Sequence, residues 1–144
     1  GRLTIYTDMI NGCDQVDVED ELIEHQELFR CYKIQCTQEP RANLFFHEKA
    51  TDDDEETKQP GYKYGVTRMT AISFKGFPRL EGVSKKMAEL CSVPYWYIGV
   101  NAVCYRDGHD SIGYHADDDQ GEDKILSKFQ CTPFVVSTGC VLTY

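Results

Sequence analysis

Residues 105–119 read YRDGHDSIGYHADDD, and this segment carries the clearest pattern in the 144-residue chain. Within it His115 and Asp117 are two positions apart, so in an extended chain their side chains project to the same side. An imidazole nitrogen and a carboxylate oxygen are two of the three ligands in the facial site that holds non-haem Fe(II). The spacing therefore indicates a metal site, but a lone pair of this kind also fits an exposed histidine beside acids on a loop.

The third ligand of such a site is not evident from the spacing. None of the remaining histidines is well placed along the chain to complete it: His25, His47 and His109. Asp118 and Asp119 continue the acidic run, and carboxylates can build an aspartate-rich magnesium or calcium site instead. Both kinds of metal site stay open on the residues alone.

The segments on either side of residues 105–119 are typical of β-strands. Upstream, residues 96–105 are rich in aromatic and β-branched side chains, and a turn at residues 106–110 follows. Downstream, residues 134–144 form an apolar run that predicts one or two buried strands. Pro60 and Gly61 mark an earlier turn, after which residues 62–64 are expected to be extended.

Two amphipathic helices are predicted before these strands. Residues 16–30 place apolar side chains at roughly helical spacing among many acids: Val18, Leu22, Ile23 and Phe29. A second set predicts the buried face of a short helix that ends before Pro94: Leu80, Val83, Met87 and Leu90. Helices followed by strands predict an α+β fold in a single domain.

Charge is distributed unevenly along the chain. The whole sequence has 15 basic and 24 acidic residues, which gives a formal charge of -9. Residues 58–86, however, contain seven basic residues and one acidic residue. This basic segment could face a polyanion, or it could be a solvated face that balances neighbouring acids.

Composition restricts the class and the compartment. With 41% apolar and 27% charged residues the chain is typical of a globular protein. No apolar run approaches the roughly 18 residues of a membrane span, and no signal peptide opens the chain, so we expect no membrane insertion. The seven cysteines lack the C-x2-C pairs of a zinc site and favour a reduced, intracellular protein. Because the chain starts at Gly1 without Met and stops at Tyr144 inside an apolar run, we expect a fragment of a longer protein.

In order and spacing, residues 105–119 closely resemble the iron-binding signature of the AlkB-like 2-oxoglutarate and Fe(II)-dependent dioxygenases, in which a Tyr-x-x-Gly turn leads into His-x-Asp. Upstream, Pro40-Arg41, Phe45-Phe46 and residues 61–65 look like the nucleotide-recognition segments of the nucleic-acid demethylases in that family. Downstream, residues 132–139 look like the strand that follows the iron loop. The resemblance runs from about residue 40 to the end of the chain.

The resemblance implies a fold in which N-terminal helices and a lid hairpin pack on a double-stranded β-helix, or jelly roll. Residues 1–144 would then be one domain of this family, incomplete at its C-terminus. Residues 1–39 would be a lead-in, residues 40–94 the nucleotide-recognition and lid region with a helix, and residues 95–144 the start of the jelly-roll core. In the family the second iron histidine and the arginine that pairs with 2-oxoglutarate come from later strands, so we expect both after Tyr144 and an inactive fragment without them.

The resemblance also implies a reaction, the oxidative dealkylation of N-alkylated bases in DNA or RNA, as in the repair of alkylation damage. Fe(II), 2-oxoglutarate and molecular oxygen would together hydroxylate the alkyl carbon, which then leaves as an aldehyde. His115 and Asp117 would be the catalytic iron ligands. Tyr105 would donate its hydroxyl to 2-oxoglutarate, with a buried core tyrosine as the alternative. The family often carries an Asn where Val103 stands, and Asn101, on the same strand face as Tyr105, is the candidate substitute.

Three further residues match positions that meet the substrate in relatives. Asp119 would accept a hydrogen bond from the exocyclic amine of the target base, with a solvated acid as its alternative. Tyr62 would stack or hydrogen-bond near the base, since displaced bases are read by aromatic side chains. Arg41 would meet a phosphate or the opposite strand, with an ordinary surface arginine as its alternative.

Two other functions remain open beside dealkylation of nucleic acids. The same oxygenase chemistry could act on a protein side chain, a lipid or a small molecule, as it does in some relatives. A catalytically inactive binding module could keep the scaffold with a vestigial metal loop, a reading that Val103 and the missing second histidine favour. We expect a monomer, and a nuclear location follows only from the nucleic-acid substrate.

Overall fold

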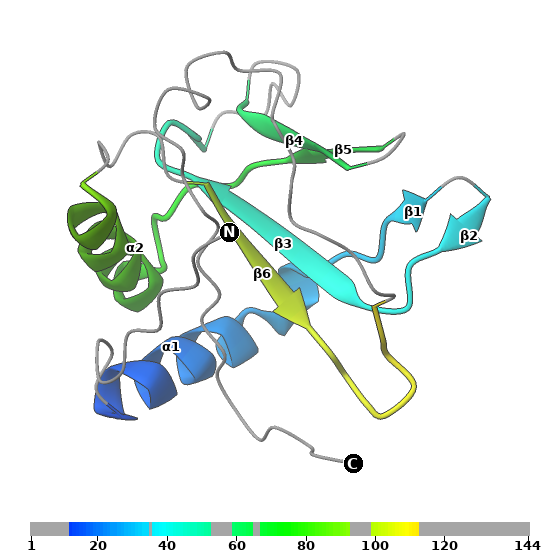
Figure 1. The fold of residues 1–144 in the computed structure, drawn as a ribbon, viewed down its shortest axis with the longest axis horizontal. Coiled ribbons are helices and arrows are strands. Elements are labelled where there is room, and N and C mark those ends of the chain that lie inside the picture. Colours follow the sequence, from blue (N-terminus) through cyan, green and yellow to red (C-terminus); the bar gives the residue numbers. More distant parts are fainter. Residues whose placement is uncertain (1–11, 35, 53–58, 65–66, 93–98, 113–144) are drawn as a thin grey trace, which may run out of the picture.

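The computed structural model describes residues 12–34, 36–52, 59–64, 67–92 and 99–112, and these residues form an α+β arrangement (Figure 1). The class expected from the sequence is thus confirmed at this level. The strands expected at residues 134–144 and the metal-binding pair lie outside the described residues, and so does most of the expected jelly roll. The elements in chain order are α1 (Gly12–Glu24), the 3-10 helix η1 (Gln26–Leu28), β1 (Lys33–Ile34), β2 (Thr37–Gln38), β3 (Ala42–His47), β4 (Gly61–Tyr64), β5 (Thr67–Thr70), α2 (Pro78–Cys91) and β6 (Gly99–Cys104).

The central element is β3, which is hydrogen-bonded along both edges. It pairs antiparallel with β6 over six residues, from Ala42 opposite Cys104 to His47 opposite Gly99. Its other edge makes short bridges to Arg30 and Ile72. A run of apolar and β-forming residues that is covered on both faces suits such an interior strand, and five of its six residues are buried.

One face of β3 carries the main hydrophobic core. Leu44 and Phe46 point toward the two helices, where they meet Val18 of α1 and Leu80 of α2. The Phe46 ring, which has no exposed surface, stacks on Phe74 at 5.5 Å between ring centroids. It also meets a second ring, that of Phe77, edge to face at 4.8 Å. Figure 1 shows both helices on this side of the β3–β6 pair, with the β4–β5 hairpin on the other.

The opposite face of β3 carries a smaller cluster. Phe45 packs there with Ala50, Met69 and Ala71. Its ring lies over Gly99 of β6, where an added Cβ would stand 2.8 Å from the ring edge. A glycine is therefore required at the start of β6 for this approach.

The sequence located both helices, with differences at their ends and faces. The first helix ends at Glu24 rather than at residue 30, and residues 26–28 continue as a 3-10 turn. The expected burial of Leu90 is wrong, because its side chain is 45% exposed. The buried face of α2 instead follows a four-residue repeat, Leu80, Ser84 and Ala88. The buried Ser84 is tolerated there because its hydroxyl donates to the Leu80 carbonyl at 2.8 Å. Neither helix in the described part of the chain combines the length and hydropathy of a membrane span.

The start of α2 is satisfied by a side chain from α1. Phe77 at the N-cap provides no side-chain hydrogen bond, and the first N–H groups of a helix have no partner within it. The buried Glu21 carboxylate accepts from the backbone N–H groups of Arg79 and Leu80, each at 2.9 Å. A negative charge at a helix N-terminus is also favoured by the helix dipole. Glu21 thus joins the two helices that cover the core.

We predict that Glu21→Ala lowers the free energy of unfolding by about 1–2 kcal/mol, because one buried and one part-buried N–H group lose their acceptor. Urea unfolding followed by circular dichroism measures the change. Glu24→Ala, an exposed position on the same helix, is the matched control and is expected to have little effect. Equal destabilisation by the two variants would contradict the capping role.

Candidate functional site

The second face of the β3–β6 pair combines the small Phe45 cluster with a group of polar side chains. Alternate residues of a strand share a face, so Arg41 and Asn43 lie on the same side as Phe45. The register continues to Tyr105, which follows β6 and faces Arg41, while Asn101 of β6 faces Phe45. Segments about 60 residues apart in sequence therefore contribute to one polar network, which also includes Glu39.

Glu39 lies at the centre of this polar network. Its side chain accepts from Arg41 Nε through Oε1, and from Asn43 Nδ2 through Oε2 at 2.9 Å. All three residues are buried, with exposed fractions of 6%, 7% and 1% in chain order. Burying a charge is costly unless it is paired and hydrogen-bonded, and here both carboxylate oxygens have a donor.

The polar network reaches the surface at two points. Arg41 Nη1 donates to the Tyr105 hydroxyl at 3.2 Å, and Tyr105 itself is 49% exposed. Asn101 Nδ2 donates to Asn43 Oδ1 at a longer 3.4 Å, and Asn101 is also exposed. The two residues expected to contact 2-oxoglutarate thus share a strand face and are both tied to the same buried carboxylate.

These positions exclude two of the alternatives that the sequence left open. Tyr105 is not a buried core tyrosine, since half of it is exposed. Arg41 is not a surface arginine, since it is 7% exposed and engages both Glu39 and Tyr105. The proposed contacts of Tyr105 with 2-oxoglutarate and of Arg41 with a phosphate stay predictions.

Glu39 and Asn43 were not singled out from the sequence. The signal was present, because polar side chains alternate at positions 39, 41 and 43 as the chain enters the apolar strand β3. Such an alternation normally indicates a solvent-facing side, so only the burial of both faces of β3 reveals a buried polar network.

The turn after β6 is closed by an ion pair. The Arg106 guanidinium donates to both carboxylate oxygens of Asp110, through Nε at 2.7 Å and Nη2 at 2.8 Å. The backbone N–H of Arg106 donates to the same carboxylate at 2.8 Å, and the Asp107 carboxylate accepts from the backbone N–H of His109. This fork-shaped pairing fixes the path of the chain just before the segment that carries His115 and Asp117.

The closed turn shifts the pKa values of both partners. The hydrogen bonds from the side chain and the backbone N–H of Arg106 lower the pKa of Asp110 to about 2, from an ordinary value of 3.8. The pKa of Arg106 is raised by the hydrogen bond to Asp110 and by its charge. Because the pKa of Asp110 is lowered in the folded protein, its charged form stabilises the turn at pH values above the ordinary pKa of 3.8. This stabilisation is lost as the pH falls from 3.8 through about 2.

The remaining site candidates are placed differently. Tyr62 lies in β4, where its backbone pairs with that of Met69 in β5. His115, Asp117 and Asp119 lie outside the described residues. Within the described part of the chain no group of three or more histidine, cysteine, aspartate or glutamate side chains is arranged to hold a metal ion.

The other histidines have local roles in the fold. His25 lies against the Phe77 ring at 4.7 Å, and His109 is exposed in the closed turn. His47 ends β3, and its Nδ1 accepts from the Lys49 backbone N–H at 3.1 Å. Burial lowers the pKa of His47 below its ordinary value of 6.5.

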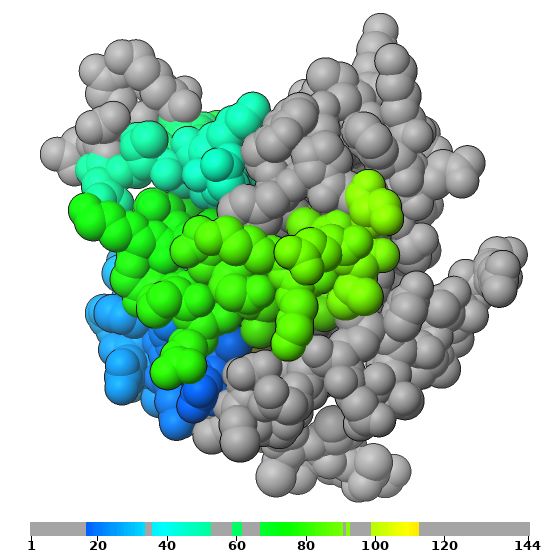
Figure 2. Space-filling model, turned by 90° about the vertical axis from the view of Figure 1, so that its left-hand side faces the viewer, coloured from blue at the N-terminus to red at the C-terminus, as the bar shows by residue number. Residues whose placement is uncertain are grey.

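Part of the basic segment at residues 58–86 is balanced by acids. Three of its cations on and near α2 form exposed ion pairs: Lys75 with Asp52 at 2.6 Å, Arg79 with Asp17 at 3.2 Å, and Lys85 with Glu81 at 2.8 Å. Figure 2 shows this side of the molecule, with α2 in green across the middle and α1 in blue below it. These three residues therefore fit the alternative of a solvated face balanced by neighbouring acids better than a surface that binds a polyanion.

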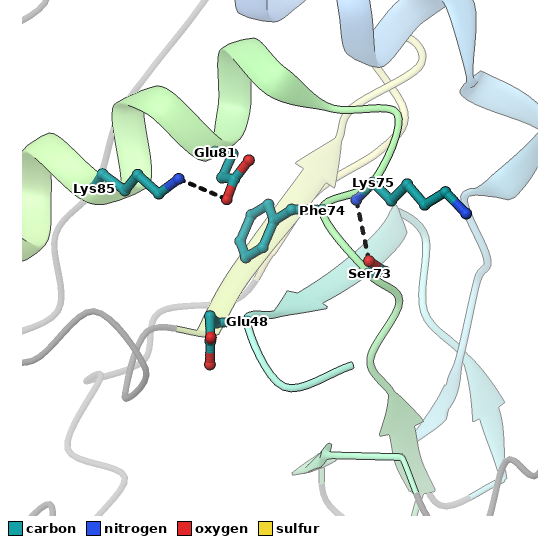
Figure 3. A pocket seen from close by; sticks show the side chains of 6 residues that line it. All are labelled: Glu48, Ser73, Phe74, Lys75, Glu81 and Lys85. Carbon is teal, nitrogen blue, oxygen red and sulfur yellow. Dashed lines mark hydrogen bonds and ion pairs between the residues drawn. The ribbon is translucent and has the colours of Figure 1, made fainter. Parts of the chain in front are cut away.

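A hollow of about 450 Å³ lies between α2 and the segment after β3. It is lined by six residues, shown in Figure 3: Glu48, Ser73, Phe74, Lys75, Glu81 and Lys85. Some of its polar groups already pair with one another, Glu81 with Lys85 and the Lys75 backbone N–H with Ser73 Oγ at 3.1 Å. The hollow therefore offers fewer convergent polar groups than the polar network around Glu39.

No protein-family model, no curated protein and no solved structure matches this chain. The family resemblance thus rests on the motifs quoted from the sequence.

We predict that the Asp110 carboxyl titrates with a midpoint near pH 2, because Arg106 stabilises its charged form. Carboxyl chemical shifts followed by NMR from roughly pH 1 to 6, on both sides of the expected midpoint, measure this. In Arg106→Gln, which removes the charge and one arm of the fork, the midpoint is expected to rise toward 3.8. A midpoint near 3.8 in the unsubstituted protein would show that the turn is not closed in solution.

Proposed function

We propose that this protein is an AlkB-like Fe(II)- and 2-oxoglutarate-dependent dioxygenase that removes N-alkyl groups from bases in DNA or RNA. The observation that supports this most directly is the common face of Asn101 and Tyr105, whose strand runs into the closed turn and then into the segment with His115 and Asp117. An exposed hydroxyl and an exposed amide on one strand face are the neutral donors that a dicarboxylate co-substrate needs for orientation.

The hydrogen bonding of Tyr105 fits a role in binding the co-substrate. The Tyr105 oxygen accepts a hydrogen bond from Arg41, so its own O–H is left to donate to another acceptor. Asn101 carries its amide on the same face, although Val103 stands at the position where the family often has Asn. An amide is nevertheless present opposite Val103, since that residue pairs with Asn43 in the register.

His115 and Asp117 would hold the iron under this proposal, and Tyr105 and Asn101 would orient 2-oxoglutarate beside it. When bound, the iron and 2-oxoglutarate would activate molecular oxygen, which is the oxidant for hydroxylation of the alkyl carbon. Asp119 would accept from the exocyclic amine of the base and Tyr62 would stack on it, as in a jelly-roll domain with a lid hairpin.

A second candidate keeps the chemistry and changes the substrate to a protein side chain, a lipid or a small molecule. The observation that favours it is the pairing of Lys75, Arg79 and Lys85 with acids, which reduces the attraction of this face for phosphates. An inactive binding module is the third, and absence of turnover in the full-length gene product would support it.

We predict that His115→Ala abolishes iron-dependent turnover of 2-oxoglutarate to succinate in the full-length gene product, because one of the proposed ligands is lost. Isothermal titration with Fe(II) under anaerobic conditions and succinate formation measure binding and turnover separately. The matched control is His109→Ala, which removes an exposed histidine six residues earlier and is expected to keep turnover within about twofold. Unchanged turnover in His115→Ala would refute the assignment.

We also predict salt-dependent binding to alkylated oligonucleotides, with affinity that falls as salt rises, roughly in proportion to the number of phosphates contacted. Fluorescence anisotropy with single- and double-stranded probes measures the slope. The double variant Lys75→Gln/Lys85→Gln is expected to change the slope by less than about one, because both lysines are paired with acids. Absence of any binding would favour the second candidate.

A further inference from the structure

We infer that Glu39 is a positioning residue that orients both proposed co-substrate contacts, Tyr105 through Arg41 and Asn101 through Asn43. This inference rests on the proposed function for its catalytic consequence, while the positioning itself is a property of the fold. Glu39 is not expected to touch a substrate, since it is 6% exposed and its carboxylate contacts the buried Arg41 and Asn43.

Hydrogen bonds reach both oxygens of the buried Glu39 carboxylate. The two oxygens of Glu39 are divided between two donors, Arg41 at Oε1 and Asn43 at Oε2. A buried carboxylate that only balanced a neighbouring cation would need the first contact and not the second. Its use of both oxygens fixes the direction of an arginine and of an amide at the same time.

The Arg41 branch sets the direction of the Tyr105 hydroxyl. A guanidinium is planar and its donors are held in a fixed fork, so anchoring Nε at Glu39 also fixes where Nη1 points. Nη1 donates to the Tyr105 oxygen at 3.2 Å. Because that oxygen then accepts from the protein interior, its hydrogen is directed toward the exposed side of the residue.

The Asn43 branch acts in the same way on Asn101. Asn43 is 1% exposed, and its Nδ2 donates to Glu39 at 2.9 Å. This contact determines which end of the Asn43 amide faces β6, so that Oδ1 accepts from Asn101 Nδ2 at 3.4 Å. The Asn43 amide is thus oriented by Glu39, because an ionised carboxylate only accepts hydrogen bonds and so selects the NH2 end of the amide.

The closing experiment compares two buried glutamates that each accept two hydrogen bonds. Glu39→Gln removes the charge within the polar network, and Glu21→Gln removes the charge at the start of α2, away from the network. The first readout needs no activity: the ring signal of Tyr105 in the metal-free protein labelled with ¹³C-tyrosine, assigned with Tyr105→Phe. We expect the signal to move in Glu39→Gln and to stay in place in Glu21→Gln.

The second readout is steady-state turnover of 2-oxoglutarate by the full-length gene product. We expect Glu39→Gln to raise KM for 2-oxoglutarate about tenfold with kcat changed less than about twofold, since it weakens a hydrogen bond that orients the co-substrate. On a Tyr105→Phe background the increase is expected to be smaller, because the Arg41 branch has lost its target while the Asn43 branch remains. Glu21→Gln is expected to lower thermal stability while KM stays unchanged.

The outcomes separate the inference from the proposed function. A Tyr105 signal that does not move in Glu39→Gln, or a full tenfold effect retained on the Tyr105→Phe background, would overturn the positioning role. No turnover in the unsubstituted protein would refute the proposed function, and the NMR readout would still decide whether Glu39 orients Tyr105. Should Glu39→Gln fail to fold, Arg41→Lys gives the same two readouts, because a lysine keeps the charge but lacks the fork that joins Glu39 to Tyr105.

Discussion

The constraint on which this structure depends is the burial of β3 on both faces. One face supplies the hydrophobic core through Phe46, which has no exposed surface, and the other carries Asn43, which is 1% exposed. Polar groups on the second face cannot rely on water, so each must find a partner within the fold. Glu39 meets this requirement for Arg41 and Asn43 together, and for that reason the strand can be interior and polar at once.

The pairing of β3 with β6 converts this local requirement into a long-range one. The register sets Arg41 beside Tyr105, 64 residues later in the chain, and sets Asn43 within reach of Asn101. A slip of one residue would turn every side chain of β6 to the opposite face and separate these pairs. Phe45 and Gly99 help to fix the register, because the ring occupies space that any other residue at position 99 would fill.

These features explain what could and could not be predicted from the sequence. Periodicity located α2 and residue composition located β6, since both depend on local patterns, but the helical pattern misplaced Leu90, which is exposed because the helix packs along Leu80, Ser84 and Ala88. The motif proposed Tyr105, and the alternation along its strand proposed Asn101. Glu39 was missed, since burial of an acid depends on a partner strand some 60 residues away. The helix N-cap shows the same limit, because the acceptor for α2 comes from Glu21 of another helix.

The location of a charge matters more here than the charge count. Exposed ion pairs such as Lys75 with Asp52 are screened by water and ions, and they contribute about 0–1 kcal/mol each. The buried pair of Glu39 and Arg41 adds little to the net free energy of unfolding either, because the cost of removing both charges from water offsets their attraction. The pair does fix the orientation of both side chains, because separating them would leave a buried charge without a partner. Three cations of the basic segment are thus balanced at the surface, whereas the buried pair of Glu39 and Arg41 controls how a tyrosine hydroxyl and an amide are presented at the proposed site.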